Sequence, residues 1–308
     1  MTKKTLSFIL TSRCNFSCKF CLRKISSKDL PISLAKEILI QAKTYHFSNI
    51  NFTGGEPLLY PDLEKITKLI VKKGFILSFV TNGYLFKENV SLLRGCRNLL
   101  GTITFSLEDH NPEIHDYLRQ RGSFDRLLEA FRICRKEHFR FGIMTEVNSL
   151  NYDHIFDIAK LAQKEKAAWI VFVPVLPCSR AKNNGLVLSD EKRRQLYYII
   201  EGIREIIDFP IGESCMLFSP NSFLPCCYLD MRELRIDLNG DLLFCNVLGD
   251  LGTRKVIASV PKVGLKKALL LYNKSVYEFT NDRINNLEDS ANFDFNNCFY
   301  CLKKYRIV

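Results

Sequence analysis

The chain has 308 residues, of which 47% are hydrophobic and 25% charged, and this balance is ordinary for a globular enzyme with one large core or two domains. No run of about 18 apolar residues occurs, so we expect no membrane span. The formal net charge is +11, but the basic residues are dispersed in pairs, which favours a lysine-rich surface over a nucleic-acid-binding face.

The chain contains twelve cysteines, which in a secreted protein would suggest a disulfide framework. The first strand begins too early to leave room for a signal peptide, and the cysteines are clustered. We therefore expect a cytoplasmic protein whose cysteines bind metal.

An apolar run over residues 5–10 predicts a buried strand, and a cysteine loop follows it. In this loop, Cys14, Cys18 and Cys21 are spaced as C-x3-C-x2-C. Thiolates are the usual ligands of iron–sulfur clusters. A four-iron cluster has four ligand positions and this loop offers three, so one iron would remain open, as a catalytic metal site requires.

Residues 51–57, Asn-Phe-Thr-Gly-Gly-Glu-Pro, follow the second expected strand. Together with the cysteine loop and the aromatic Phe20 before its third cysteine, this run resembles the signature of the radical S-adenosylmethionine (SAM) superfamily. The resemblance implies a [4Fe-4S] cluster on the three cysteines, with SAM at its open iron. A zinc site or a set of plain thiols is the alternative.

The resemblance also assigns roles within the second motif. Gly54 and Gly55 would let the backbone approach the methionine ammonium of SAM, Glu56 would accept a hydrogen bond from it, and Pro57 completes the motif.

Strand and helix patterns alternate from this point to residue 173. We expect strands over residues 50–52, 75–80, 101–106, 141–147 and 168–173, and helices over 31–47, 61–74, 123 onward and 155–166. Six alternations predict an α/β fold with a parallel sheet, and six units are too few to close an eight-stranded barrel. The partial (β/α)6 barrel of the radical SAM family fits this count.

Polar residues collect where these strands end, which is where barrel enzymes carry their chemistry. The candidates are Thr81, Asn82, Ser106, Glu108, Asn148 and Arg180. The family resemblance implies SAM contacts for Asn82, Ser106, Asn148, a recurrent arginine at Arg119, and an adenine contact at Leu176. A turn, a strand-end cap or a solvated charge explains each of these residues about as well.

The composition changes after residue 210, so we expect a barrel over residues 1–210 and a small α+β subdomain over 211–308. Residues 232–237 and 241–244 flank Leu-Asn-Gly, which predicts a hairpin with Gly240 in its turn. The later cysteines, spaced around this glycine and ending in C-x2-C, resemble the Twitch subdomain. Twitch is the shortened form of the SPASM extension of radical SAM enzymes.

The Twitch resemblance implies a second [4Fe-4S] cluster, with the ligands Cys227, Cys245, Cys298 and Cys301. Cys226 satisfies the same spacing and stays open as the alternative to Cys227, and a four-thiolate zinc site is the alternative to iron. Four ligands would fill this cluster, so we expect it to transfer electrons or to support the wall of the active site.

Two further cysteines, Cys178 and Cys215, are catalytic candidates. At the barrel mouth, either thiol could return a hydrogen atom to a substrate radical. Cys96 and Cys134 lie in apolar contexts and are expected in the core.

The resemblance implies an enzyme that cleaves SAM to a 5′-deoxyadenosyl radical and abstracts a substrate hydrogen. Oxidative modification or crosslinking of a ribosomally made peptide is the first choice. The alternatives are a small-molecule dehydrogenase acting on an alcohol or amino sugar, a peptide epimerase, an RNA-modifying enzyme and a non-catalytic cluster protein. The expected partners are the substrate, a reductant such as flavodoxin or ferredoxin, and a separate leader-peptide-binding protein.

Overall fold

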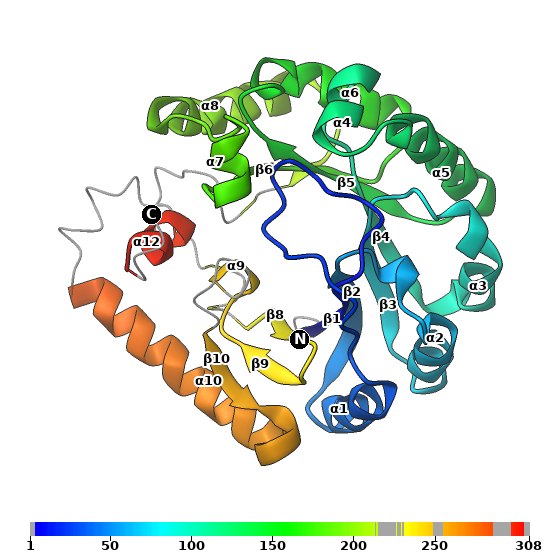
Figure 1. The fold of residues 1–308 in the computed structure, drawn as a ribbon, viewed down its shortest axis with the longest axis vertical. Coiled ribbons are helices and arrows are strands. Elements are labelled where there is room, and N and C mark those ends of the chain that lie inside the picture. The colour runs from blue at the N-terminus through cyan, green and yellow to red at the C-terminus, as the bar shows by residue number, and fades with distance from the viewer. Residues whose placement is uncertain are drawn as a thin grey trace.

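A computed structural model of the chain describes residues 4–212, 214, 226, 229, 231–248, 255–285 and 297–304. Its centre is a curved sheet with helices on the outside (Figure 1). The strands that form the barrel are β1 (Lys4–Thr11), β2 (Phe47–Gly54), β3 (Ile76–Thr81), β4 (Leu100–Ser106), β5 (Phe141–Val147), β6 (Ile170–Pro174) and β7 (Ile211–Gly212).

Helices connect these strands. They are α1 (Ile32–Thr44), α2 (Leu63–Lys72), α3 (Val90–Gly95), α4 (Pro112–Leu118), α5 (Ser123–Glu137), α6 (Ile155–Lys164), α7 (Ser179–Asn183) and α8 (Asp190–Ile206). The 3-10 turns are η1 (Pro57–Leu59), η2 (Lys87–Asn89), η3 (Arg97–Leu99) and η4 (Tyr152–His154). The Ser189 side chain accepts a hydrogen bond from the Lys192 backbone and so caps the N-terminus of α8.

The C-terminal part adds a hairpin and two longer helices. Its elements are β8 (Glu233–Ile236), β9 (Asp241–Leu243), α9 (Asn246–Leu248), β10 (Val256–Ser259), α10 (Val260–Asn285) and α12 (Asn297–Lys304). Gly264, with a φ of 74°, interrupts α10 near its start.

The strands within the described residues belong to one sheet in the order β10-β9-β8-β1-β2-β3-β4-β5-β6-β7. The pairs from β1 to β7 are parallel, whereas β9 and β10 are antiparallel to their neighbours. β7 and β10 lie at the two ends of the order, so the sheet is an open partial barrel. The predicted α/β class and partial barrel are confirmed.

The two faces of the sheet differ in polarity because successive strand residues point to opposite sides. The outward residues pack under the helices in the main hydrophobic core and include Phe8, Phe52, Phe79 and Phe105. The alternate residues face the inside of the barrel and include Ser7, Asn51, Ser78 and Thr104. The barrel interior therefore carries polar side chains that can contact a polar ligand.

The hairpin joins the barrel directly, because β8 pairs in parallel with β1. On the inner face, the Asn51 amide donates to Ser7 Oγ at 3.1 Å, and Ser7 Oγ donates to Glu233 Oε1 at 2.6 Å. The boundary that the sequence suggested after residue 210 thus falls within a continuous sheet, with β7 beside β6 and β8 beside β1.

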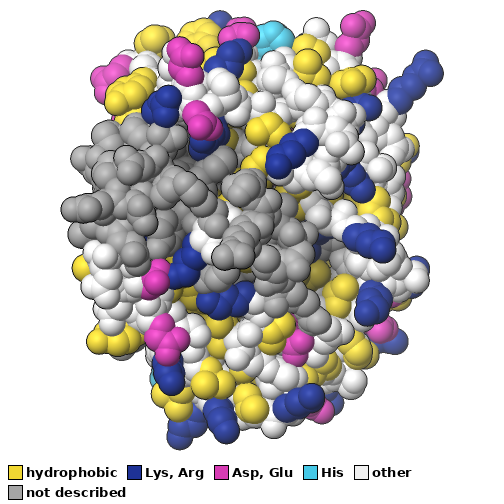
Figure 2. Space-filling model, turned by 60° about the vertical axis from the view of Figure 1, so that its left-hand side comes forward, with side chains coloured by type: hydrophobic (Ala, Val, Ile, Leu, Met, Phe, Trp, Pro, Cys, Tyr) yellow, Lys and Arg dark blue, Asp and Glu magenta, His cyan; other side chains and the backbone are white. Residues whose placement is uncertain are grey.

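Among the described residues, no helix is long and apolar enough to cross a bilayer. Lys and Arg side chains are spread over the face shown in Figure 2, with Asp and Glu side chains between them. Among the described side chains on this face, the basic residues do not form one continuous patch.

Candidate functional site

The three cysteines of the first motif lie on the loop that leaves β1. Cys14, Cys18 and Cys21 are half-buried and are in no disulfide. Backbone N–H groups of the same loop donate to two of the sulfurs, from Phe16 to Cys14 and from Arg23 to Cys21, each at 3.4 Å. Burial raises the pKa of Cys18 to about 12. Ionisation of the Cys18 thiol is therefore favoured by a bound cation, which fits a metal-ligand loop.

The cysteine loop is joined to the Gly-Gly-Glu-Pro turn by backbone hydrogen bonds. Gly55 N donates to Thr11 O at 2.8 Å, and Glu56 N donates to Arg13 O at 2.7 Å. A Cβ on Gly54 would lie 2.4 Å from Thr11 O, and one on Gly55 would lie 2.0 Å from Arg13 O. Only glycine fits there, so the two sequence motifs form one structural unit.

Glu56 is 1% exposed and links the ends of β2 and β3. Its Oε1 accepts from Thr81 Oγ1 at 2.7 Å and Leu58 N at 3.1 Å, and its Oε2 accepts from Asn82 N at 2.8 Å. Burial raises the pKa of this carboxyl, and these hydrogen bonds oppose the shift. Oε2 retains capacity for one further donor, such as an ammonium group.

Two neighbours complete this corner of the site. The Asn82 amide donates to Asn15 Oδ1 at 2.8 Å, which ties the end of β3 to the cysteine loop. Pro57 is buried and begins η1, where its missing N–H is tolerated.

Arg119 lies against the cysteine loop and pairs with Glu108. Its Nη2 and Nε lie 2.6 Å and 2.8 Å from Glu108 Oε1, and its guanidinium lies 5.8 Å from the Phe20 ring centroid. Glu108 Oε2 accepts from Glu146 N at 2.8 Å. The Glu108 side chain is fully buried and that of Arg119 is 8% exposed, so the pair fixes the guanidinium beside the cysteine loop. Sequence analysis named both residues but not their pairing.

Glu146 was missed by sequence analysis. It is half-buried near the end of β5, on the inner face, and burial together with the Glu108 carboxylate raises its pKa to about 8. The local signal in the sequence is that Glu146 comes two residues after Met144, so the two side chains share one face of the strand.

The other candidate SAM contacts fall in different surroundings. Ser106 ends β4 and is half-buried on the inner face. Asn148 is fully buried, where its amide donates to Glu146 O at 2.9 Å and its carbonyl accepts from Leu150 N at 3.0 Å. Asn148 therefore closes the turn after β5.

Leu176 lies between the two cysteine regions. It packs with Val247 and Leu302, and Leu22 and Cys245 border this small cluster. Leu22 follows Cys21 and Leu302 follows Cys301, so one apolar contact links both regions.

Of the two catalytic cysteine candidates, Cys178 lies within the described residues. Cys178 is 8% exposed; its Sγ accepts from Ala181 N at 3.4 Å as the cap of α7 and donates to Phe20 O at 3.5 Å. Cys215 lies outside the described residues.

The second cysteine region is a small pocket with apolar walls. Four cysteines line it, together with leucine, valine and phenylalanine side chains: Cys226, Cys245, Cys298, Cys301, Leu229, Phe244, Val247, Leu248 and Phe279. Burial, and next the neighbouring Cys245, raises the pKa of Cys301 to about 12. Four thiols on one pocket fit a metal centre with four thiolate ligands. Of the two adjacent candidates, Cys226 lines the pocket, while Cys227 lies outside the described residues.

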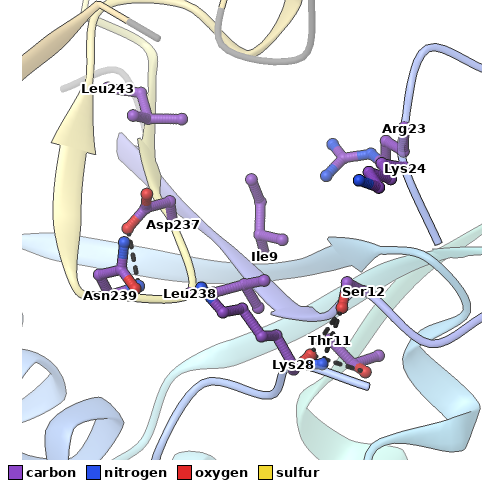
Figure 3. Close-up of a pocket in the computed structure, with 10 residues that line it drawn as sticks. All are labelled: Ile9, Thr11, Ser12, Arg23, Lys24, Lys28, Asp237, Leu238, Asn239 and Leu243. Carbon is purple, nitrogen blue, oxygen red and sulfur yellow. Dashed lines mark hydrogen bonds between the residues drawn. The ribbon is translucent and has the colours of Figure 1, made fainter. Parts of the chain in front are cut away.

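A separate cavity, of about 320 Å³, opens between the cysteine loop and the hairpin (Figure 3). Arg23 and Lys24 lie on one side and Asp237 on the other, with Ile9 between them and Lys28 on the floor. Three cationic side chains on one cavity suit a ligand with negative charge.

Comparison with known proteins places these features in a family. The family model for the radical SAM superfamily matches residues 8–162. Mycofactocin maturase MftC of Mycolicibacterium smegmatis is 26% identical over 82% of this chain and 69% of its own length. The S-adenosylmethionine-dependent nucleotide dehydratase of Selenomonas ruminantium is 28% identical over 59% of this chain and 70% of its length.

This chain spans only 60%, 59% and 56% of the length of three other curated relatives. Among solved structures, Streptococcus suis SuiB bound to S-adenosylmethionine is 19% identical, with a TM-score of 0.72 over 90% of this chain and 67% of SuiB. This likeness concerns the fold.

Proposed function

Because this chain belongs to the radical SAM superfamily, we propose that it binds a [4Fe-4S] cluster through Cys14, Cys18 and Cys21 and uses SAM to oxidise a peptide substrate. When bound, the cluster supplies the electron that cleaves SAM into methionine and the 5′-deoxyadenosyl radical, which takes a hydrogen atom from the substrate. The observation that carries this proposal is the joining of the cysteine loop to the Gly-Gly-Glu-Pro turn by two backbone hydrogen bonds.

The residues around that junction bind and orient SAM in this proposal. Glu56 Oε2 accepts from the methionine ammonium, since it has one remaining lone-pair position. Arg119, held by Glu108, presents its positive charge to the methionine carboxylate. Ser106 contacts the ribose from the inner face, and Phe20 supports the guanidinium from the cysteine loop.

The second cysteine pocket holds an auxiliary [4Fe-4S] cluster in this proposal, with Cys226, Cys245, Cys298 and Cys301 as ligands. The choice of Cys226 over Cys227 is supported by its place on the pocket wall. When bound, this cluster supplies an acceptor for one electron. The apolar side chains around the pocket exclude water from it.

The proposed outcome is net oxidation. Net oxidation would remove one substrate hydrogen as an atom, to the 5′-deoxyadenosyl radical, and a second as a proton, and a cluster held by Cys226, Cys245, Cys298 and Cys301 would supply the acceptor for the remaining electron. Cys178 is not proposed as a hydrogen donor, because its thiol is engaged at the start of α7.

A peptide substrate is supported by similar folds. SuiB has been solved bound to the precursor peptide SuiA, with a TM-score of 0.69, and anSMEcpe with AdoMet and the Cp18Cys peptide, with a TM-score of 0.71. The match to a maturase over 82% of this chain agrees with this class.

Turnover in heavy water, read by mass spectrometry, tests the proposal once a substrate peptide has been identified from neighbouring genes. Oxidation predicts a product about two mass units lighter, one SAM consumed per product and no deuterium at the product carbon. A product that gains one deuterium would instead show that a thiol returns hydrogen, which makes the protein an epimerase.

A small phosphorylated molecule is the second candidate substrate. The cationic cavity beside the cysteine loop and the similarity to a nucleotide dehydratase both favour it. Equilibrium binding of nucleoside triphosphates to the reconstituted protein, with Lys24→Ala and Lys28→Ala as variants, distinguishes it from a peptide. Tight binding that both substitutions weaken favours the nucleotide.

A further inference from the structure

We propose that Asp109, His110 and His154 form a binding site for a divalent metal ion, separate from the two cysteine regions. The site does not depend on the proposed reaction. It lies at the rim of the barrel, where two neighbouring connections meet.

The topology brings these residues together. Asp109 and His110 lie in the loop between β4 and α4, and His154 is the last residue of η4, which follows β5 (Figure 1). β4 and β5 are adjacent parallel strands, so their C-terminal connections meet at one edge of the sheet. No sequence spacing indicates the cluster, because His154 is 45 residues from Asp109.

The ligand atoms lie close enough together to share an ion. Asp109 Oδ2 lies 2.8 Å from His154 Nδ1, a hydrogen bond in this structure, and Asp109 Oδ1 lies 3.1 Å from His110 Nδ1. One ligand atom of each residue lies within 4.8 Å of the other two. Ligand bonds of about 2.0–2.2 Å at a tetrahedral angle place neighbouring ligand atoms about 3.4 Å apart, so small outward shifts of the two imidazoles would admit an ion.

His110 provides a second observation. Its Nδ1 is buried and has no hydrogen-bond partner within the described part of the chain, although a carboxylate oxygen lies 3.1 Å away. The two atoms approach each other without the alignment of an N–H···O bond. A buried polar atom in this state needs an explanation, and a shared cation at the convergence point provides one.

The protein holds the carboxylate firmly while leaving access for an ion. The Asp109 side chain is 0% exposed, and Oδ1 also accepts from Asn111 N at 2.8 Å. The His110 and His154 side chains are 37% and 33% exposed, and their rings meet edge to face at 5.2 Å. An ion could therefore enter from solvent and keep water as its remaining ligands.

The ligand types select the metal class. Two imidazoles and one carboxylate suit Zn²⁺ or another borderline divalent ion, whereas Mg²⁺ and Ca²⁺ prefer oxygen ligands throughout.

An ion at this position would also stabilise the SAM-facing loop. Glu108, the partner of Arg119, directly precedes Asp109, and the Asn151 amide near His154 donates to Glu108 O at 2.7 Å. A metal that joins the β4–α4 loop to η4 would therefore hold Glu108 in place. This consequence, unlike the site itself, rests on the proposed function.

Zinc binding by anaerobically reconstituted protein tests the proposal, because iron then occupies the cysteine thiolates. The protein is titrated with Zn²⁺ against a fluorescent chelator, and zinc is counted after desalting. We expect about one zinc per chain, with affinity at least about tenfold weaker in His110→Ala and in His154→Ala. His46→Asn is the matched control, since His46 lies away in the α1–β2 turn with a φ of 60°, which asparagine tolerates.

A third variant guards against loss of folding. Asp109→Asn keeps an oxygen for the Asn111 N–H but removes the charged ligand, so it should also lose the zinc. Zinc should raise the midpoint of thermal unfolding of the unmodified protein and of His46→Asn only. Equal zinc content and equal thermal shift in the unmodified protein and all three site variants would overturn the proposal and assign the zinc to cysteines.

Discussion

The two cysteine regions bring several thiols together in opposite ways. In the first, three cysteines occupy eight residues of one loop, and polar groups such as Glu56, Asn82 and Arg119 surround them. In the second, the cysteines are spread from residue 226 to residue 301 and meet in a pocket with apolar walls. The first region thus depends on local sequence and a hydrogen-bond network, the second on tertiary packing.

The largest effect should follow removal of the first cysteine set. Reconstituted protein should carry about eight irons, and the triple replacement of Cys14, Cys18 and Cys21 by Ala should leave about four and abolish SAM cleavage. Cys96→Ser, at a buried thiol that donates to Leu93 O, is the control and should retain both properties. Residual cleavage by the triple variant would contradict the assignment.

The second region should separate SAM cleavage from product formation. Cys245→Ala should remove about four irons while cleavage of SAM continues, because the first loop is intact. Cys226→Ala should likewise lose these irons and keep SAM cleavage, whereas Cys227→Ala should not lose them. A zinc content near one per chain with only about four irons would replace the auxiliary cluster by a zinc site.

Breaking the polar network should affect the first region more than the second. Arg119→Ala leaves the fully buried Glu108 without its cation, so the free energy of unfolding should fall by about 3–5 kcal/mol. The matched apolar change is Leu302→Ala, at a 0% exposed side chain beside the second pocket, which should cost about 2–5 kcal/mol. Iron analysis of the folded variants should show loss of iron from the first site in Arg119→Ala and from the second site in Leu302→Ala.

Glu56→Ala should weaken SAM binding while both clusters are retained. The substitution leaves the donors of Thr81, Leu58 and Asn82 without their acceptor, at about 1–3 kcal/mol for each group that stays buried and unpaired. Glu56→Gln preserves an acceptor, so in equilibrium titrations its affinity for SAM should lie between those of the unmodified protein and Glu56→Ala. Unchanged affinity in Glu56→Ala would remove this carboxyl from the SAM site.

A further effect concerns pH. The pKa of Glu146 is about 8 in the folded protein and about 4.3 in an unfolded chain. Between these values the folded state binds more protons, so the contribution to stability is present at low pH and is lost as pH rises to about 8. Glu146→Gln should therefore stabilise the protein at pH 8 relative to pH 5, as measured by denaturant unfolding. Glu113→Gln, at an exposed position on α4, should show no such difference.

Sequence analysis succeeded where signals are local. The strand over residues 141–147 has the predicted bounds. The long-range features escaped it. The hairpin at residues 233–243 was expected, but its pairing with β1 depends on contacts between residues more than 220 positions apart. Cys226 and Cys227 fit one spacing equally well, and only the folded chain shows that Cys226 lines the pocket.

The candidate site shows the same division. The spacing of the cysteine loop and the Gly-Gly-Glu-Pro turn is visible in the sequence. The pairing of Arg119 with Glu108, and the raised pKa of Glu146, arise from burial at the end of the barrel. The Asp109, His110 and His154 cluster likewise exists only because two strand ends are adjacent.

The junction between the cysteine loop and the Gly-Gly-Glu-Pro turn also bears on how the protein matures. Its hydrogen bonds all lie within the first 56 residues, so the loop can close once β1 and β2 pair. The second pocket needs residues up to Cys301. At a synthesis rate of about 5–20 residues per second, the ribosome finishes the second set roughly 10–50 s after the first. The two cysteine sets would therefore become available for metal in a fixed order during translation.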